Sequence, residues 1–313
     1  MLLRRLLMLP HLVRWGIRAP RGAEGGWDRY WAGVGTTGDG GDVLWDSGDP
    51  AEPERYLAIL ARFADPALPV VDLGCGNGRF TRAICERGWR GVGVDVSEAA
   101  VALARAEAGA APDGPSFVVA DLTAPGAVDG VHEGPDGAHV FVRGVLHVLT
   151  PEARRQVVRN IRLLLGERGT LVVAETNHRG SLLSYLESLG AGARGLPHPL
   201  ARAIASGLPT PRPFGVDELA RTFPDEDWER VHVDDTAVIH AVPMHRHSDR
   251  PERISGLVAV LRGRDHAIPA PRGADQADSA GRAASRAATS EASGSAPTVS
   301  DQCRTSRPPG STR

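Results

Sequence analysis

The sequence predicts an α/β fold built on a doubly wound, mainly parallel sheet. Short, continuous apolar runs rich in Val and Leu alternate with helical patterns between residues 68 and 175. Such runs are typical of strands that helices cover on both faces. The first run also ends in a glycine-rich loop, which is where doubly wound folds commonly bind a ligand.

The elements can be placed in order along this alternation. Ser97 is a favoured N-cap for the second helix, and Thr150 followed by Pro151 is a favoured start for the third. Strands are predicted at 68–73, 91–96, 116–120, 140–142 and 170–175, and helices at 80–87, at 98–107 and from 151 to about 166.

The last part of the domain departs from the alternation. A helix is expected at 217–222, followed by two successive strands at 228–242 and 254–261 with a His- and Arg-containing loop between them. Successive strands of this kind pair antiparallel. An antiparallel pair that closes a parallel sheet is a mixed arrangement found in doubly wound folds.

The candidate ligand site begins at the loop VVDLGCGNG, residues 70–78. Its glycines allow a tight turn and a close approach to a ligand. A dinucleotide-binding loop would place a third glycine where this chain has Arg79, which disfavours a nicotinamide cofactor. Asp95 ends the second predicted strand, where a carboxylate can accept both ribose hydroxyls. Asp121 and Leu122 end the third, where they can address the amino group and the face of an adenine.

Five ordered segments resemble the motifs of the class I S-adenosylmethionine-dependent methyltransferases. They read VVDLGCGNGRF, GVGVDVS, FVVADLT, VFVRGVLHVLT and GERGTLVVAET. The resemblance covers about residues 68–261. It implies a seven-stranded Rossmann-like sheet with an antiparallel last strand, S-adenosylmethionine as the cofactor, and methyl transfer as the reaction.

The resemblance also implies, position by position, which residues contact the cofactor. The implied contacts are Asp72, Gly74, Cys75, Gly76 and Gly78 for the methionine part, Asp95 for the ribose, and Val96, Asp121 and Leu122 for the adenine. The alternatives are a simple tight turn for the glycine loop, solvated strand ends for Asp95 and Asp121, and a small loop-filling residue for Cys75.

The sequence favours a small-molecule acceptor over nucleic acid. The [DNS]-P-P-[YFW] motif of the amino-methylating nucleic-acid enzymes does not follow the fourth strand. The chain also has no Pro-Cys pair, which the cysteine-adduct route to C5-methylated pyrimidines would need. A net charge of −2 and 5% aromatic residues also argue against a nucleic-acid partner. We expect oxygen as the accepting atom, with nitrogen and sulfur as alternatives.

Three residues near the expected substrate mouth are candidates for chemistry. Arg143 can hold a carboxylate or form a structural salt bridge. His147 can act as a general base or simply pack. Glu175 ends the fifth strand on the cofactor face.

Two segments are expected to cover the site. Trp27, Tyr30 and Trp31 lie in residues 25–45 and, with Arg143-Gly144, are similar to the N-terminal lid and active-site arginine of thiopurine and halide methyltransferases. A hydrophobic anchor is the alternative for these aromatic residues. Residues 177–214 are too long for a plain connection and are interpreted as an apolar substrate cap, with a dimer contact or simple packing as alternatives.

Two other classes of function are alternatives to a methyltransferase. A non-catalytic regulator or partner subunit that binds S-adenosylmethionine would keep the glycine loop and Asp95 but tolerate loss of Arg143 and His147. A nicotinamide-dependent oxidoreductase is disfavoured by Arg79.

Composition sets the remaining limits. All 36 basic residues are Arg, which excludes chemistry that requires a lysine. Cys75, Cys85 and Cys303 have no metal-binding spacing, so no metal site is expected and a cytoplasmic location is the default. No apolar run reaches the length of a membrane span, so no stable membrane insertion is expected, and a homo-oligomer is left open.

The chain is expected to have three parts. Residues 1–24 are interpreted as a poorly ordered extension, with an amphipathic surface helix as the alternative. Residues 25–264 form the methyltransferase domain. Residues 265–313 have no aromatic residue and few large aliphatic ones, so this tail is expected to be disordered.

Overall fold

The computed structural model describes residues 2–19, 25–111, 114–131, 136–244 and 250–264. The tail at 265–313, expected to be disordered, lies outside the described residues together with Cys303. Residues 20–24 of the expected N-terminal extension also lie outside them.

The core is a mixed, mainly parallel sheet in the order β3-β2-β1-β4-β5-β8-β6. The strands β1 to β5 run parallel, and β8 pairs antiparallel with β5 and with β6. The predicted doubly wound sheet with an antiparallel closing strand is therefore confirmed. The strands are β1 (Val70–Leu73), β2 (Gly91–Asp95), β3 (Ser116–Val119), β4 (His139–Arg143), β5 (Leu171–Thr176), β6 (Trp228–Asp234), β7 (Val238–Ala241) and β8 (Glu252–Gly263).

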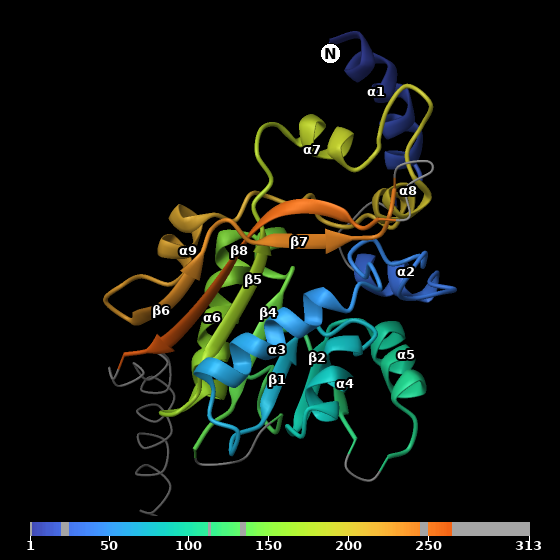
Figure 1. Cartoon of the computed structure of the whole chain (residues 1–313). Helices are drawn as coiled ribbons and strands as arrows, with labels where there is room; N and C mark the ends of the chain where they lie inside the picture. The colour runs from blue at the N-terminus through green and yellow to red at the C-terminus, as the bar shows by residue number, and fades with distance from the viewer. Residues whose placement is uncertain (1, 20–24, 112–113, 132–135, 245–249, 265–313) are drawn as a thin grey trace, which may run out of the picture. The chain divides into compact units, whose positions relative to one another are not determined.

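Helices cover both faces of the sheet, as buried parallel strands require. One face packs against α6 and α9, and the other against α3 and α4. Figure 1 shows α3 and α6 on opposite sides of the strands. The helices are α1 (Leu2–Gly16), α2 (Gly26–Ala32), α3 (Ala51–Phe63), α4 (Arg79–Glu86), α5 (Glu98–Ala108), α6 (Pro151–Leu165), α7 (Leu182–Ser188), α8 (His198–Ala205) and α9 (Val216–Thr222), with a short 3₁₀ helix η1 (Leu146–Val148).

Local capping explains where two of these helices begin. The Ser97 hydroxyl accepts a hydrogen bond from the backbone N–H of Ala100, and the Thr150 hydroxyl accepts one from Ala153. Each satisfies an N–H group that has no partner within its helix. Both predicted caps are confirmed.

The predicted strand at 228–242 is in fact two strands, which brings the total in the described residues to eight. A tight turn separates β6 from β7, where Asp234 Oδ1 accepts hydrogen bonds from the backbone N–H and the hydroxyl of Thr236 at 3.0 and 2.8 Å. Such side-chain bonds favour turns over continued pairing. Both strands pair with the twelve-residue β8.

The N-terminal segment forms a helix, in contrast to the loose extension expected from the sequence. Met8 of α1 is fully buried, and the Arg5 guanidinium pairs with Glu187 of α7 at 2.9 Å. Apolar packing and an ion pair thus hold α1 against the cap. Within the described part of the chain, no helix is both long and apolar enough to cross a membrane.

Candidate active site

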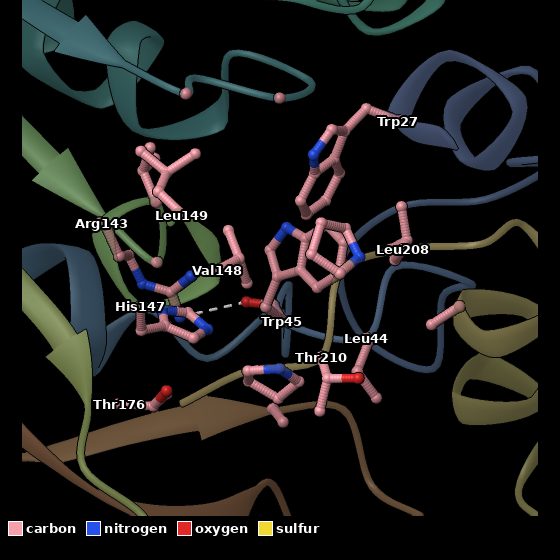
Figure 2. A pocket seen from close by; sticks show the side chains of 18 of the residues that line it. Trp27, Leu44, Trp45, Arg143, His147, Val148, Leu149, Thr176, Leu208 and Thr210 are labelled. Atoms are coloured by element: carbon pink, nitrogen blue, oxygen red, sulfur yellow. Dashed lines mark hydrogen bonds between the residues drawn. The ribbon is translucent and has the colours of Figure 1, made fainter. Parts of the chain in front are cut away.

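A cavity of about 500 Å³ lies at the carboxyl ends of the parallel strands (Figure 2). Residues following β1 to β5 form one wall, and the cap and the N-terminal segments form the other. The strand-end wall includes Gly74, Gly76, Asp95, Val96, Asp121, Leu122, Gly144, His147 and Thr176, and the apolar wall includes Leu12, Leu44, Tyr185, Leu186, Leu189, Leu200 and Ile204. The residues at 177–214 therefore do line the cavity from α7 and α8.

The glycine loop after β1 leaves no room for side chains. Gly74 and Gly76 have φ angles of +76° and +54°, which favour glycine. A Cβ on Gly74 would lie 2.3 Å from Val145 Cγ2, and one on Gly76 would lie 2.6 Å from Trp31 Cζ2. The backbone of this loop consequently forms part of the cavity floor.

Asp95 connects the glycine loop to the end of β2. Its buried carboxylate accepts hydrogen bonds from the backbone N–H groups of Gly76 and Ser97, both at 2.9 Å. Burial raises its pKa above the ordinary range. Asp95 thus lines the cavity while also holding the glycine loop in place.

The expected adenine residues lie along the same wall. Val96 is exposed, Leu122 is buried, and both line the cavity. Asp121 is exposed and lines it as well, with Oδ1 accepting from the N–H and the hydroxyl of Thr123 at 2.9 and 2.7 Å. Residues from the ends of β2 and β3 therefore lie on one wall of the cavity.

The expected methionine residues face a second, smaller cavity of about 110 Å³ beside the first. Asp72 and Cys75 line it, together with Gly74 and Gly76, which line both cavities. Gly78 lines neither. A Cβ there would lie 2.4 Å from Phe117 Cε1, so the lack of a side chain leaves room for the Phe117 ring of β3.

Asp72 is a second buried acid of the site with a raised pKa. Its buried carboxylate accepts a hydrogen bond from the Thr81 hydroxyl at 2.7 Å. Loss of solvation raises its pKa to about 7, and the nearby Asp95 acts in the same direction. Burial also raises the pKa of the Cys75 thiol, so this cysteine is a poor nucleophile.

The raised pKa of Asp72 predicts a pH-dependent stability. The folded state binds this proton at about pH 7, whereas the ordinary Asp value is 3.8, so the free energy of unfolding should fall as pH rises between these values. Asp72→Asn should remove this part of the dependence, because an amide carbonyl can still accept from Thr81. Urea unfolding at several pH values measures the slope. Asp235→Asn, in the exposed β6–β7 turn, is the control, and parallel curves for wild type and Asp72→Asn would contradict the prediction.

His147 and Glu175 form a buried pair at the cavity wall. His147 Nδ1 lies 2.5 Å from Glu175 Oε2. The fully buried Glu175 carboxylate also accepts from the backbone N–H groups of Val145 and Leu146, at 3.0 and 2.7 Å. With the carboxylate as acceptor, the neutral imidazole carries its proton on Nδ1 and its lone pair on Nε2. Figure 2 shows the His147 ring among the cavity-lining side chains.

Arg143 forms a salt bridge with Glu52, a partner that no motif in the sequence indicates. Its guanidinium makes hydrogen bonds of 2.9 to 3.1 Å to both carboxylate oxygens of Glu52, on α3. It also donates to the backbone carbonyls of Trp45 and His240 at 3.1 and 3.2 Å. Glu52 further accepts from the Tyr56 hydroxyl at 2.7 Å. The structural salt bridge is thus the role that the structure favours for Arg143, although its side chain still lines the cavity.

The aromatic residues of the N-terminal segment divide into lining and anchoring groups. Trp27 and Trp31 line the cavity. Tyr30 is fully buried, and its hydroxyl accepts from the backbone N–H of Leu44 at 3.0 Å, which is the behaviour of an anchor. Trp45, absent from the predicted site, lines the cavity and stacks on Tyr30 at a centroid distance of 5.0 Å.

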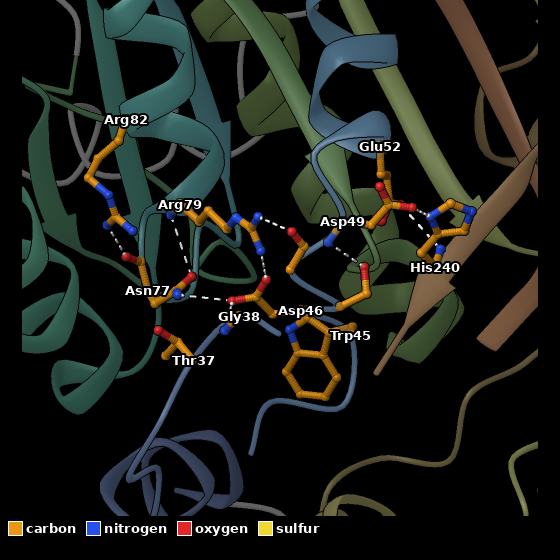
Figure 3. Close-up of polar contacts among 12 residues, drawn as sticks. Thr37, Gly38, Trp45, Asp46, Asp49, Glu52, Asn77, Arg79, Arg82 and His240 are labelled. Carbon is orange, nitrogen blue, oxygen red and sulfur yellow. Dashed lines mark hydrogen bonds and ion pairs between the residues drawn. The ribbon is translucent and has the colours of Figure 1, made fainter. Parts of the chain in front are cut away.

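A polar cluster fastens residues 35–49 to the glycine loop (Figure 3). The Asp46 carboxylate pairs with Arg79 at 2.5 Å and accepts from Asn77 Nδ2 and the Gly38 N–H at 3.2 and 3.0 Å. Arg79 also donates to the Gly48 carbonyl at 2.7 Å. The arginine that replaces the third glycine of a dinucleotide loop therefore holds the segment above the loop.

Comparison with known proteins agrees with this architecture. Residues 70–169 match the family model of a methyltransferase domain. Within the described residues, no cluster of His, Cys, Asp and Glu could hold a metal ion.

Solved structures add matches over most of the chain. A SAM-dependent methyltransferase from Anabaena variabilis ATCC 29413 is 24% identical over 79% of this chain and 97% of its own, with a TM-score of 0.64. A protein studied for the conversion of a disulfide bond into a thioacetal group during echinomycin biosynthesis is 21% identical over 78% of this chain and 91% of its own, with a TM-score of 0.51. These matches confirm the fold, and the family model agrees with the methyltransferase motifs within residues 70–169.

Proposed function

We propose, from the premise that this chain carries a class I methyltransferase domain, that it transfers a methyl group from S-adenosylmethionine to a small, largely apolar acceptor. One observation carries the proposal. The larger cavity joins most of the strand-end residues expected to hold the cofactor to a chamber lined by aliphatic side chains of the cap; these residues are Gly74, Gly76, Asp95, Val96, Asp121 and Leu122.

The residues present suit this cofactor. The loop at Gly74 and Gly76 would hold the methionine part, together with Asp72. Asp95 would hold the ribose, and Val96, Asp121 and Leu122 the adenine. When bound, S-adenosylmethionine supplies a methyl group already activated on a sulfonium.

The chain's own part in the reaction is to position the acceptor, exclude water and remove a proton. The apolar cap excludes water. The free Nε2 of His147 is suited to take the proton of an acceptor hydroxyl, and Glu175 holds the ring in the tautomer that this requires. This pair favours oxygen as the accepting atom, because a sulfide or a neutral amine has a lone pair available without a base.

The same pair bears on the non-catalytic alternative. A regulator that only binds the cofactor has no need of a buried carboxylate that orients a histidine toward the acceptor chamber. We therefore propose catalysis, on a small molecule and without a nucleic-acid partner, within a domain at 25–264 whose lid is 25–45 and whose cap is 177–214. A cytoplasmic location is part of the same proposal.

Binding of S-adenosylhomocysteine tests the cofactor site directly. We expect calorimetric titration to detect binding, and Asp95→Ala to weaken it by about 1–3 kcal/mol because hydrogen-bonding groups of the ligand and of the loop lose their partner. Asp235→Ala, in the exposed β6–β7 turn, should bind like wild type. Absence of binding to the intact chain, or equal affinity in Asp95→Ala, would overturn the assignment of this site.

A further inference from the structure

Helix α1 has an inner and an outer face. On the inner face Met8 is fully buried, and Leu12 lines the cavity. On the outer face Leu6, Val13 and Ile17 are 53%, 58% and 78% exposed. The spacing of seven and eleven residues places these three on one stripe of a helix. The Ile17 N–H donates a hydrogen bond to the Val13 carbonyl at 2.9 Å, which extends the helical turn to Ile17.

Exposed apolar side chains gather on this helix rather than scatter over the molecule. Eleven large apolar side chains are exposed among the described residues, and five of them lie between residues 6 and 17, namely Leu6, Leu7, Leu9, Val13 and Ile17. Contiguous apolar exposure of this kind marks a surface that contacts another phase or another molecule.

The charges around this face indicate what it contacts. Arg14 and Arg18 are exposed beside the stripe, and the Arg18 guanidinium lies 4.4 Å from the centroid of the Trp15 ring. The first 22 residues contain five Arg and no Asp or Glu, although the whole chain has a net charge of −2. Aliphatic, Trp and Arg side chains on one short helix match the interface of an anionic bilayer.

We propose that the outer face of α1 docks this protein on the surface of an anionic lipid bilayer. The fifteen-residue helix with Pro10 lies along the interface, since it is too short to span the hydrocarbon core. Leu12 on its inner face lines the acceptor chamber, as does Leu182 of α7, which is also exposed. Docking would thus bring the chamber to the bilayer. The docking itself does not depend on the proposed function, but the entry of apolar acceptors from the bilayer rests on it.

Flotation of the full chain with vesicles tests the docking. The probes are phosphatidylcholine vesicles with and without phosphatidylserine. The double variant Val13→Glu with Ile17→Glu removes the apolar stripe, and Arg14→Glu with Arg18→Glu reverses only the charge. Leu163→Glu is the matched control, because Leu163 on α6 is 51% exposed and far from α1 in sequence.

We expect the intact chain to float with the phosphatidylserine vesicles and not with phosphatidylcholine alone. Each double variant should lower the bound fraction at least about tenfold, and Leu163→Glu should not. All variants should bind S-adenosylhomocysteine as the intact chain does, so failure of the cofactor site would be seen separately. The proposal is overturned if the intact chain does not float, or if Leu163→Glu lowers the bound fraction as much as the double variants do. It is also overturned if the intact chain is a dimer without vesicle binding and Val13→Glu with Ile17→Glu splits that dimer. A second copy of the chain would then be the occupant of this face.

Discussion

Replacing His147 by Ala should slow methyl transfer by about 10²–10⁴-fold while leaving the affinity for S-adenosylhomocysteine unchanged. The reason is that Glu175 holds Nδ1 of the His147 ring, which leaves Nε2 to accept the proton of the acceptor hydroxyl. The measurement is transfer of a labelled methyl group to a panel of phenols, enols and carboxylic acids, with the most active compound used for the variants.

The control for this variant is His198→Ala, in the cap but largely exposed. It should leave the rate within a few-fold of the intact enzyme. If His147→Ala kept the full rate on this oxygen acceptor, His147 would not be the base, and its pairing with Glu175 would serve packing.

Glu175→Gln distinguishes positioning from chemistry. The amide keeps the size of the carboxylate but turns a donor toward a site where backbone N–H groups of Val145 and Leu146 and the imidazole already donate. We expect a lower rate, a lower stability and a shifted pH–rate profile. A purely structural Glu175 would lower stability and leave the pH profile where it was.

The strand-end part of the site could be predicted from sequence because the fold brings it together. Gly74 and Leu122 follow strands that the local apolar pattern reveals, and Asp95 ends another. Parallel strands present their carboxyl ends at one edge of the sheet. Ser97 and Thr150 are likewise local signals, and their caps formed as expected. The order of the strands in the sheet is needed only to place these residues beside one another.

The rest of the site depends on contacts that no local pattern records. Glu52 lies 91 residues before Arg143 and in no motif, yet the two carry the main buried ion pair of the cavity wall. Trp45 lies in a stretch without periodicity, and its place follows from stacking on Tyr30. The break in the strand at 228–242 was missed because a three-residue Asp–Thr turn is a weak signal within a β-rich run.

The buried ion pair leads to the largest effect on stability that we expect. Glu52→Ala should lower the free energy of unfolding by about 3–5 kcal/mol, because it leaves the Arg143 guanidinium buried without its counter-charge. Glu54→Ala is a close control on the same turn of α3. Glu54 pairs with Arg87, but both side chains are about half exposed, so its loss should cost about 0–1 kcal/mol. Urea unfolding followed by circular dichroism measures both.

A second variant separates loss of the pair from loss of helix packing. Combining Glu52→Ala with Arg143→Met removes the unpaired charge, so the double variant should be more stable than Glu52→Ala alone. If Glu52→Ala cost no more than Glu54→Ala, the guanidinium would have to find solvent or another partner without strain. Arg143 would then be available to the cavity, and the role that its position in the sequence first indicated, holding a carboxylate of the cofactor or the acceptor, would replace the salt bridge.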